Sequence, residues 1–424
     1  MNSTEEAQQL LRQGHYAEAE RAFERVLEAV PDDVDALNAV ALACARRGDL
    51  HRSLSLMHRA VAANPNNPVS NHHLARVQDS LGNLPVATEA HRRSVQLRPD
   101  FHVARLYLGE ILERAGDMNS AVIQYVRALQ DAQTSGRWLN PATTPEPLQP
   151  LIQHAVLAVR NGRRTAFAEL LEPLVKKYGA TALLRVHRTI DVYLNEATAI
   201  PSDHRQQPKF LYFPDLPTTP YFDRDLFPWI TELELHTQDI RGELKKMLRS
   251  DTGRERVFDN EVTESENLRG VQVAPSWNGY YFYRHGERRE DNCAACPITA
   301  KILDGLPLSR VNKHGPEVLF SVFTPGTHLL PHRGVTNTRL VSHLPLIVPR
   351  DCALNVGGEI HRWKESEVVV FDDTYEHEAW NRSDQIRVVL IFDIWNPYLT
   401  EVERAAIADL IVAIGDFRHD IETS

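Results

Sequence analysis

Glycines recur at a fixed interval near the start of this chain. Gly14, Gly48, Gly82 and Gly116 are each separated by 34 residues. Five positions after each glycine stands a small residue: Ala19, Ser53, Ala87 or Ala121. Nine positions after it stands Phe23, Met57, His91 or Tyr125, and the first three copies close with Pro31, Pro65 and Pro99. A small side chain lets two helices cross closely, a bulky one fills the groove, and proline ends a helix. The period therefore predicts an array of helical hairpins.

This pattern resembles the tetratricopeptide repeat over residues 1–135. No single hairpin can bury its apolar side alone, so four of them are expected to stack into an α-solenoid with a concave face. The resemblance implies that the groove binds a peptide or protein. The alternative is that the array only supports or dimerises another domain.

Residues 136–205 are predicted to be a proline-rich linker followed by a helical spacer. Four prolines between positions 139 and 150 break the helical pattern. Helical periodicity then resumes over residues 151–199, with Leu157 and Leu171 among the expected buried positions.

From about residue 206 the chain changes to short β-rich runs separated by Pro, Gly and Asn. These runs include residues 279–283, 318–323, 340–348, 367–371 and 387–393. Many short strands at this spacing favour a double-sheet jelly roll over residues 206–424, in which alternate side chains point inward. The apolar spacing in residues 400–417 predicts a helix packed on this domain.

Several motifs in this region resemble the aspartyl/asparaginyl β-hydroxylase family, over about residues 208–400. They are Pro325-Gly326-Thr327-His328 with Pro331-His332-Arg333-Gly334, Thr336-Asn337-Thr338-Arg339-Leu340, Phe371-Asp372-Asp373 with Glu376-His377-Glu378, and Asp393-Ile394-Trp395-Asn396-Pro397. The resemblance implies a double-stranded β-helix that uses Fe(II) and 2-oxoglutarate.

The predicted metal ligands are His332 and His377. A non-heme iron site commonly adds a carboxylate two residues after the first histidine. Here that residue is Gly334, which by itself weakens the metal assignment. The resemblance implies that the family lacks this carboxylate and that water can take its position. The alternative is that both histidines are ordinary core residues.

Arg387 is the predicted anchor for the co-substrate, because a cation inside a barrel requires an anion. The resemblance implies that Arg387 and Ser321 bind the distal carboxylate of 2-oxoglutarate and that His343 lies near the other carboxylate. Arg339, on the same strand face as His343, and Trp277 complete the predicted co-substrate residues. The resemblance implies that Trp277 lies at the mouth of the site; the alternative is an ordinary packing role. The family pattern has an arginine where this chain has Val341. Asp372 and Asp373 are expected to shape a turn or to orient His377.

Composition narrows the class of protein further. The formal charge of −10 argues against a nucleic-acid binder. No window approaches eighteen apolar residues and the start lacks a secretory signal, so the sequence predicts a cytoplasmic protein without a membrane span. Of the four cysteines, only Cys293 and Cys296 form a CxxC, which is expected to be a pair of plain loop thiols.

The leading functional hypothesis is a dioxygenase that uses molecular oxygen to hydroxylate a peptide or protein, at the β-carbon of Asp or Asn, with the repeats recruiting the substrate. One alternative keeps the chemistry but makes the substrate a small molecule, with the repeats as an assembly scaffold. Two others are halogenation, for which the missing carboxylate would leave room, and a non-catalytic repeat scaffold.

Overall fold

The computed structural model describes residues 3–250, 253–257 and 277–423. The chain divides into two compact units, one of Met1–Ala166 with Phe417–Ser424 and one of Phe167–Asp416. This division falls inside a single long helix, whereas the sequence suggested boundaries near residues 135 and 205. Those boundaries stay predictions.

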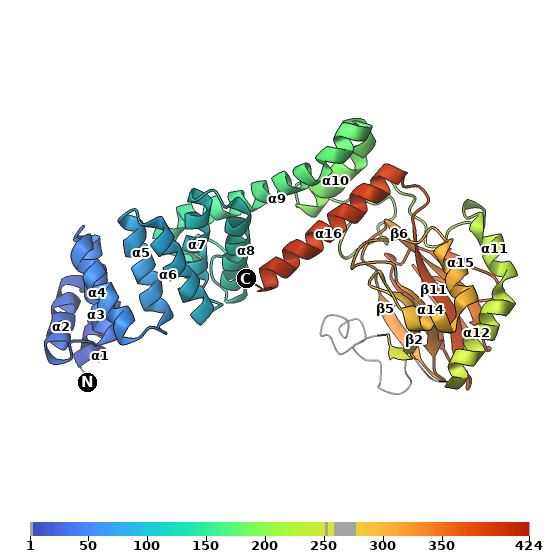
Figure 1. Cartoon of the computed structure of the whole chain (residues 1–424), viewed down its shortest axis with the longest axis horizontal. Coiled ribbons are helices and arrows are strands. Elements are labelled where there is room, and N and C mark those ends of the chain that lie inside the picture. The colour runs from blue at the N-terminus through green and yellow to red at the C-terminus, as the bar shows by residue number, and fades with distance from the viewer. Residues whose placement is uncertain (1–2, 251–252, 258–276, 424) are drawn as a thin grey trace. The chain divides into compact units, whose positions relative to one another are not determined.

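The first unit contains four consecutive helical hairpins, seen as paired helices in blue to teal in Figure 1. Their helices are α1 (Ser3–Arg12), α2 (Tyr16–Ala29), α3 (Val34–Arg46), α4 (Leu50–Ala63), α5 (Pro68–Ser80), α6 (Leu84–Leu97), α7 (His102–Arg114) and α8 (Met118–Thr134). Each repeat glycine adopts a positive φ between 80° and 85° in the turn, a conformation that favours glycine. The four small residues of the repeat are fully buried, which confirms the close helix crossings predicted from the sequence.

Helix α9 (Gln149–Tyr178) follows two short 3₁₀ turns, η1 (Pro141–Thr143) and η2 (Glu146–Leu148). Its first half packs on α7 and α8 through Ile152, Ala155 and Ala158. Leu157 was predicted to be buried but is 55% exposed, because the helix buries the face that carries Ala155 and Ala158 instead. Arg127 donates from Nη1 to the carbonyl oxygen of Ile421 at 2.5 Å, which ties the end of the chain to this unit.

The second unit begins with the other half of α9. Apolar residues of this half pack with η3 (Ala180–Leu183), α10 (Leu184–Tyr193) and α16 (Glu401–Thr423) in one cluster. Leu171 is fully buried there, as predicted, and α16 confirms the helix expected over residues 400–417.

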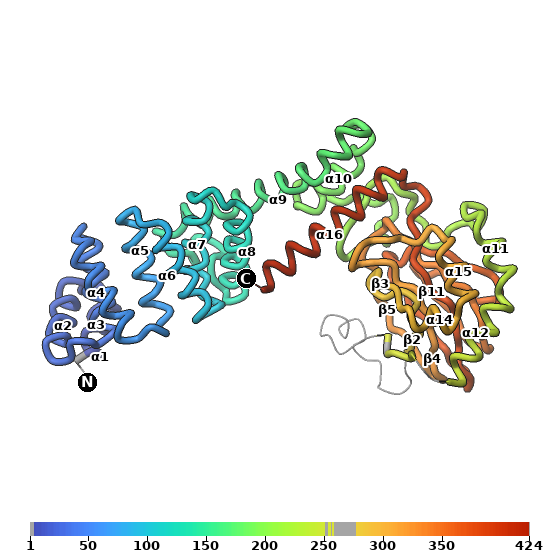
Figure 2. Tube along the Cα trace, viewed as in Figure 1, coloured from blue at the N-terminus to red at the C-terminus, as the bar shows by residue number. Residues whose placement is uncertain are grey.

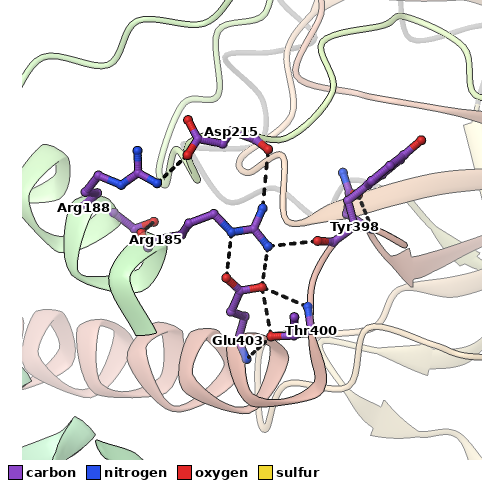
Figure 3. A network of polar contacts seen from close by, with 8 residues as sticks. Arg185, Arg188, Asp215, Tyr398, Thr400 and Glu403 are labelled. Carbon is purple, nitrogen blue, oxygen red and sulfur yellow. Dashed lines mark hydrogen bonds and ion pairs between the residues drawn. The ribbon is translucent and has the colours of Figure 1, made fainter. Parts of the chain in front are cut away.

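A polar network fastens α10 to α16 within this unit (Figure 3). Arg185 on α10 donates to both carboxylate oxygens of Glu403, at 2.7 and 2.5 Å, and to the carbonyl oxygen of Tyr398 at 3.0 Å. Because Glu403 is buried, this bidentate pair fixes the orientation of the two helices more firmly than an exposed ion pair would.

The rest of the second unit is built on two antiparallel sheets. The larger has the order β1-β2-β4-β11-β6-β9, with β3 paired to β2, and the smaller has the order β5-β10-β7-β8. The strands are β1 (Glu255–Arg256), β2 (Trp277–Arg284), β3 (Glu287–Arg288), β4 (Val318–Phe323), β5 (His328–His332), β6 (Arg339–Ile347), β7 (Cys352–Val356), β8 (Glu359–His361), β9 (Val369–Phe371), β10 (His377–Asn381) and β11 (Arg387–Trp395). One apolar cluster contains residues from both sheets, so the sheets pack face to face and the predicted double-sheet β-fold is confirmed.

The outer face of the larger sheet is covered by helices (Figures 1 and 2). They are α11 (Trp229–Leu235), α12 (Thr237–Ser250), α14 (Glu290–Ala295) and α15 (Pro297–Asp304). The short 3₁₀ turn η4 (Arg224–Leu226) precedes α11. Cys293 and Cys296 belong to this helical layer and are buried free thiols. The expected loop location was therefore wrong for Cys293, whereas Cys296 lies in the bend between α14 and α15. Burial raises the pKa of both thiols.

No helix among the described residues combines the length and apolar character needed to cross a lipid bilayer.

Candidate active site

The candidate site lies between the facing inner surfaces of the two sheets. Cross-strand partners share a sheet face, so the register identifies the side chains that point inward. On the larger sheet Arg387 is opposite Phe323, and His343 is opposite Ile391. On the smaller sheet His377 is opposite His332. The pattern of alternating residues thus brings the predicted metal ligands and the predicted co-substrate anchor to one space.

His332 and His377 form a close pair with ring centroids 4.0 Å apart. His332 Nδ1 lies 2.8 Å from the carbonyl oxygen of Leu330, and His377 Nδ1 lies 3.1 Å from that of Tyr375. A carbonyl can only accept, so each Nδ1 carries the proton and each Nε2 has a lone pair available for a metal. Burial lowers the pKa of each imidazole to about 4, which keeps both neutral near pH 7.

The position that would carry the missing carboxylate is filled from the turn between β9 and β10. A Cβ placed on Gly334 would lie 2.1 to 2.2 Å from the carboxyl carbon and both carboxylate oxygens of Asp373. The Gly334 N–H also donates to the Asp373 carbonyl oxygen at 2.6 Å. Asp373 therefore places its carboxylate where a side chain at position 334 would stand, and its Oδ1 has no hydrogen-bond partner.

Arg387 is the unpaired charge of the site. Its side chain is 1% exposed, and no carboxylate of the described residues forms an ion pair with it. Nη1 donates to Ser321 Oγ at 3.2 Å, Nε has no partner, and the guanidinium lies over the ring of Phe323 at 3.6 Å. Burial lowers the pKa of Arg387 to about 9, so the group remains charged at neutral pH and fits an anionic ligand.

Two further predicted residues border Arg387. Trp277 donates from Nε1 to Ser321 Oγ at 2.8 Å, which orients the hydroxyl beside the guanidinium. His343 is buried, and its Nδ1 has no partner. Burial, followed by the charge of Arg387, lowers the pKa of His343 well below its usual value. Val341 is buried among apolar residues of both sheets and presents no charge to this space.

Arg339 has a different environment from the one expected of a co-substrate residue. Its Nη1 pairs with Asp393, and its Nη2 lies 3.3 Å from Asp373 Oδ2. Burial opposes the charge, but the two carboxylates, Asp393 before Asp373, raise the pKa of Arg339. The guanidinium therefore holds the carboxylate of Asp373 beside Gly334, and a direct contact with 2-oxoglutarate stays a prediction.

The sequence predicts that these residues hold Fe(II) and 2-oxoglutarate. Within the described part of the chain, no three His, Cys, Asp or Glu side chains gather closely enough to form a metal site by themselves. Two neutral imidazoles, each with its Nδ1 on a backbone carbonyl, suit a metal that takes its other ligands from the co-substrate and water. The unpartnered Nε of Arg387 and Nδ1 of His343 suit a ligand with a carboxylate. Fe(II) and 2-oxoglutarate therefore both fit the residues of this site.

A cleft of about 380 Å³ reaches His377. Its described lining consists of His204, Arg205, Gln207, Pro331, Arg333, Asn355, Gly357, Gly358, Glu376, His377 and Glu378. Apart from Pro331, no aliphatic side chain contributes to that lining. The cleft therefore suits polar and hydrogen-bonding groups better than a hydrocarbon chain.

The sequence did not predict where the Asp373 carboxylate lies. Sequence spacing from His377 suggested a turn or an orienting residue, but only the folded structure brings the Asp373 turn against Gly334. The available signal was the lack of a carboxylate two positions after His332. This lack indicates that another residue could supply a carboxylate there.

The aspartyl/asparaginyl β-hydroxylase family profile matches residues 234–397, and a tetratricopeptide repeat profile matches residues 4–68 and 73–136. Aspartate beta-hydroxylase domain-containing protein 2 from Mus musculus is 34% identical over 251 residues, which cover 58% of this chain and 70% of that protein. Its Homo sapiens counterpart is 33% identical over 252 residues, covering 58% of this chain and 65% of the human protein.

Two other relatives carry more specific names. Aspartyl/asparaginyl beta-hydroxylase from Homo sapiens is 35% identical over 147 residues, covering 34% of this chain and 19% of that protein. Ornithine lipid ester-linked acyl 2-hydroxylase from Rhizobium tropici is 34% identical over 190 residues, covering 44% of this chain and 64% of that protein. The matched part of this chain thus spans less than two thirds of both human relatives.

The fold, the site and these matches agree, and the chain belongs to the aspartyl/asparaginyl β-hydroxylase family, with tetratricopeptide repeats at its N-terminal side.

Proposed function

We propose that this protein is an Fe(II)- and 2-oxoglutarate-dependent dioxygenase that hydroxylates a peptide or protein. The observation that carries the proposal is the buried guanidinium of Arg387, which has no anionic partner, in the same inter-sheet space as the paired His332 and His377. A fully buried cation without an anion is costly, and a bound dicarboxylate removes that cost.

Each residue has a defined task in this proposal. Arg387 and Ser321 bind the distal carboxylate of 2-oxoglutarate, while Trp277 orients Ser321. His343 lies near the other carboxylate. His332 and His377 hold the metal through Nε2, and their Nδ1 bonds to backbone carbonyls fix both ring orientations. Asp373 supplies an acceptor at the position beside Gly334, where Arg339 holds it.

Bound iron would supply the oxidation chemistry, with molecular oxygen and 2-oxoglutarate as co-substrates. Burial between the sheets keeps the two imidazoles neutral, so that both can bind a metal. The same geometry argues against halogenation, because the carboxyl group of Asp373 fills the space beside Gly334 that the missing ligand would otherwise leave open.

A protein or peptide substrate, modified at the β-carbon of Asp or Asn, is supported by three features. Relatives of this chain are named for that reaction, and tetratricopeptide repeats offer an extended surface that can recruit a polypeptide. The polar lining of the cleft that reaches His377 also suits a polypeptide better than an acyl chain.

A small-molecule or lipid substrate is the second candidate, and Val341 favours it. The family pattern has an arginine at this position, whereas Val341 belongs to an apolar cluster with Phe371 and Val389. A relative is named as an acyl hydroxylase of a lipid. In this candidate the repeats would serve assembly.

The test is a hydroxylation screen with the intact 424-residue chain. Anaerobically purified protein is mixed with Fe(II), 2-oxoglutarate and either a cell lysate or a lipid extract, and then exposed to air. Peptides and lipids that gain one oxygen are identified by mass spectrometry, and succinate is measured in parallel. His332→Ala is the matched control, and modification that persists in this variant would contradict the assignment.

A further inference from the structure

Residues 203–213, called the strap here, run along both segments that carry the metal-binding histidines. Their backbone pairs with the segment that follows His332. Lys209 N donates to the Gly334 carbonyl oxygen at 3.0 Å, and the N–H groups of Phe210 and Leu211 donate to that of Val335 at 2.9 and 3.0 Å. The strap lies outside residues 234–397, the region matched by the family profile.

The same strap contacts the segment that precedes His377. Gln207 N donates to the Thr374 carbonyl oxygen at 3.0 Å. Gln206 donates from Nε2 to Asp372 Oδ2 at 2.6 Å, and both side chains are buried, with 1% and 0% exposure. The other oxygen of Asp372 accepts from Thr374 N and Oγ1 at 2.9 and 2.6 Å. Asp372 therefore uses one oxygen within its own loop and the other for the strap.

Both ends of the strap are fastened. At one end Arg205 donates to the Gly357 carbonyl oxygen at 2.7 Å and pairs with Asp203, which also accepts from Tyr375 Oη at 3.3 Å. At the other end the side-chain amide of Asn337 accepts from Phe213 N and donates to Phe213 O, both at 2.8 Å. A segment held at both ends can act as a rigid spacer between the segment that follows His332 and the segment that precedes His377.

We propose that the strap positions the two metal-binding segments relative to each other, with Gln206 as the main positioning residue. The inference rests on the proposed role of His332 and His377 as metal ligands. Loss of the Gln206 amide would leave a buried carboxylate oxygen of Asp372 without a donor. The adjacent Asp373 would then lose its fixed position beside Gly334, and the His377 segment would become more mobile. The active site thus extends beyond residues 234–397, the region matched by the family profile, into the strap.

The experiment compares Gln206→Ala and Gln206→Met with Gln207→Ala in the full-length protein. Gln207 is a matched control, because its exposed side chain donates only to the His204 carbonyl oxygen and its backbone contact is retained in the variant. Affinity for Co(II), used as an Fe(II) substitute, is measured by absorption titration. Hydrogen exchange of the metal-free protein is measured for peptides covering residues 334–337 and 372–377.

We expect both Gln206 variants to weaken Co(II) binding by about tenfold or more, as for other residues that orient metal ligands, and to speed exchange in both peptides. Gln207→Ala should match the parent protein in Co(II) affinity and in the exchange of both peptides. Gln206→Met keeps most of the side-chain volume, so it remains informative if Gln206→Ala folds poorly. Unchanged Co(II) affinity in Gln206→Met would overturn the proposal, even if thermal stability falls.

His332→Ala separates failure of this inference from failure of the proposed function. If His332→Ala abolishes Co(II) binding while both Gln206 variants bind normally, the ligand assignment stands and the positioning role is wrong. If His332→Ala binds Co(II) like the parent protein, the ligand assignment itself is wrong, and the strap proposal falls with it.

Discussion

Single side chains decide the chemistry of the space between the two sheets. Arg387 could be explained as a packing residue, because its guanidinium lies over the rings of Phe323 and Trp363. Packing alone does not explain a charge at 1% exposure without an anion. A bound carboxylate accounts for the charge and for the unpartnered Nε together.

Replacing Arg387 by methionine should separate stability from co-substrate binding. Removing an unpaired buried charge should leave the unfolding temperature of the ligand-free protein unchanged or higher. The Michaelis constant for 2-oxoglutarate should rise by about tenfold or more, and thermal stabilisation by 2-oxoglutarate should disappear. Differential scanning fluorimetry and succinate assays measure both effects, with the exposed Arg382→Met as the control. Retained stabilisation by 2-oxoglutarate would show that Arg387 does not bind it.

A substitution at Gly334 should disrupt the metal site through Asp373. In Gly334→Asp the new Cβ would overlap the Asp373 carboxyl group, so one of the two segments must move and Co(II) affinity should fall by about tenfold or more. The double variant Gly334→Asp/Asp373→Gly relieves the overlap and returns one carboxylate to the same place, so affinity should partly recover. A single variant that binds Co(II) normally in absorption titrations would contradict this placement.

At the scale of elements, helices α5, α6 and α7 surround a histidine cluster with no role in the active site. His72 and His91 have ring centroids 5.1 Å apart, and both nitrogens of His91 are buried without a partner. Burial lowers the pKa of His73 to about 4 and of His91 to about 3, and that of His72 falls well below its usual value. All three are therefore neutral in the folded repeats.

The stability of the repeats should consequently decrease in acid. In the unfolded chain these histidines titrate near pH 6.5, so below that pH the unfolded state binds more protons and the free energy of unfolding falls. The loss is up to about 1.4 kcal/mol per pH unit for each histidine, and it continues down to the folded pKa values. Urea unfolding followed by helical circular dichroism at pH 7 and pH 5 measures the effect.

His91→Met is the informative variant for this cluster, because Met57 occupies the equivalent position one repeat earlier. The variant should unfold with a smaller difference between pH 7 and pH 5 than the parent protein. His51→Gln, which changes an exposed histidine of α4, is the control. An equal pH dependence in His91→Met and the parent would mean that the buried imidazole does not set the acid sensitivity.

At the scale of the whole molecule, the division inside α9 decides how the repeats can be removed. A cut at residue 135 would expose Ile152, Ala155 and Ala158, which pack on α7 and α8. A cut after Ala166, combined with removal of Phe417–Ser424, follows the compact units instead and leaves the α9–α10–α16 cluster intact.

The truncated protein should keep uncoupled 2-oxoglutarate decarboxylation, because all proposed metal and co-substrate residues belong to the second unit. Hydroxylation of its protein substrate at limiting concentration should fall, since the recruiting surface is absent. Comparing kcat/KM for the protein substrate with the rate of succinate formation tests both statements. Unchanged kcat/KM would make the repeats structural and would favour a small substrate.

The sequence by itself determined the features that depend on local periodicity. The 34-residue period predicts helical hairpins because each glycine, small residue and proline acts within its own repeat. Apolar runs predict strands such as β4 and β11, because side chains alternate along an extended backbone. The motifs around His332 and His377 also identified the family, since family resemblance is carried by short segments in order.

Only the tertiary structure decided which distant residues meet. Asp373 reaches the place beside Gly334, and Gln206 reaches Asp372 across 166 positions, through strand pairing and the course of the strap. The exposure of Leu157 likewise depends on which face of α9 the neighbouring helices cover. These outcomes depend on packing between segments remote in sequence, and local propensity carries no information about which remote segments become neighbours.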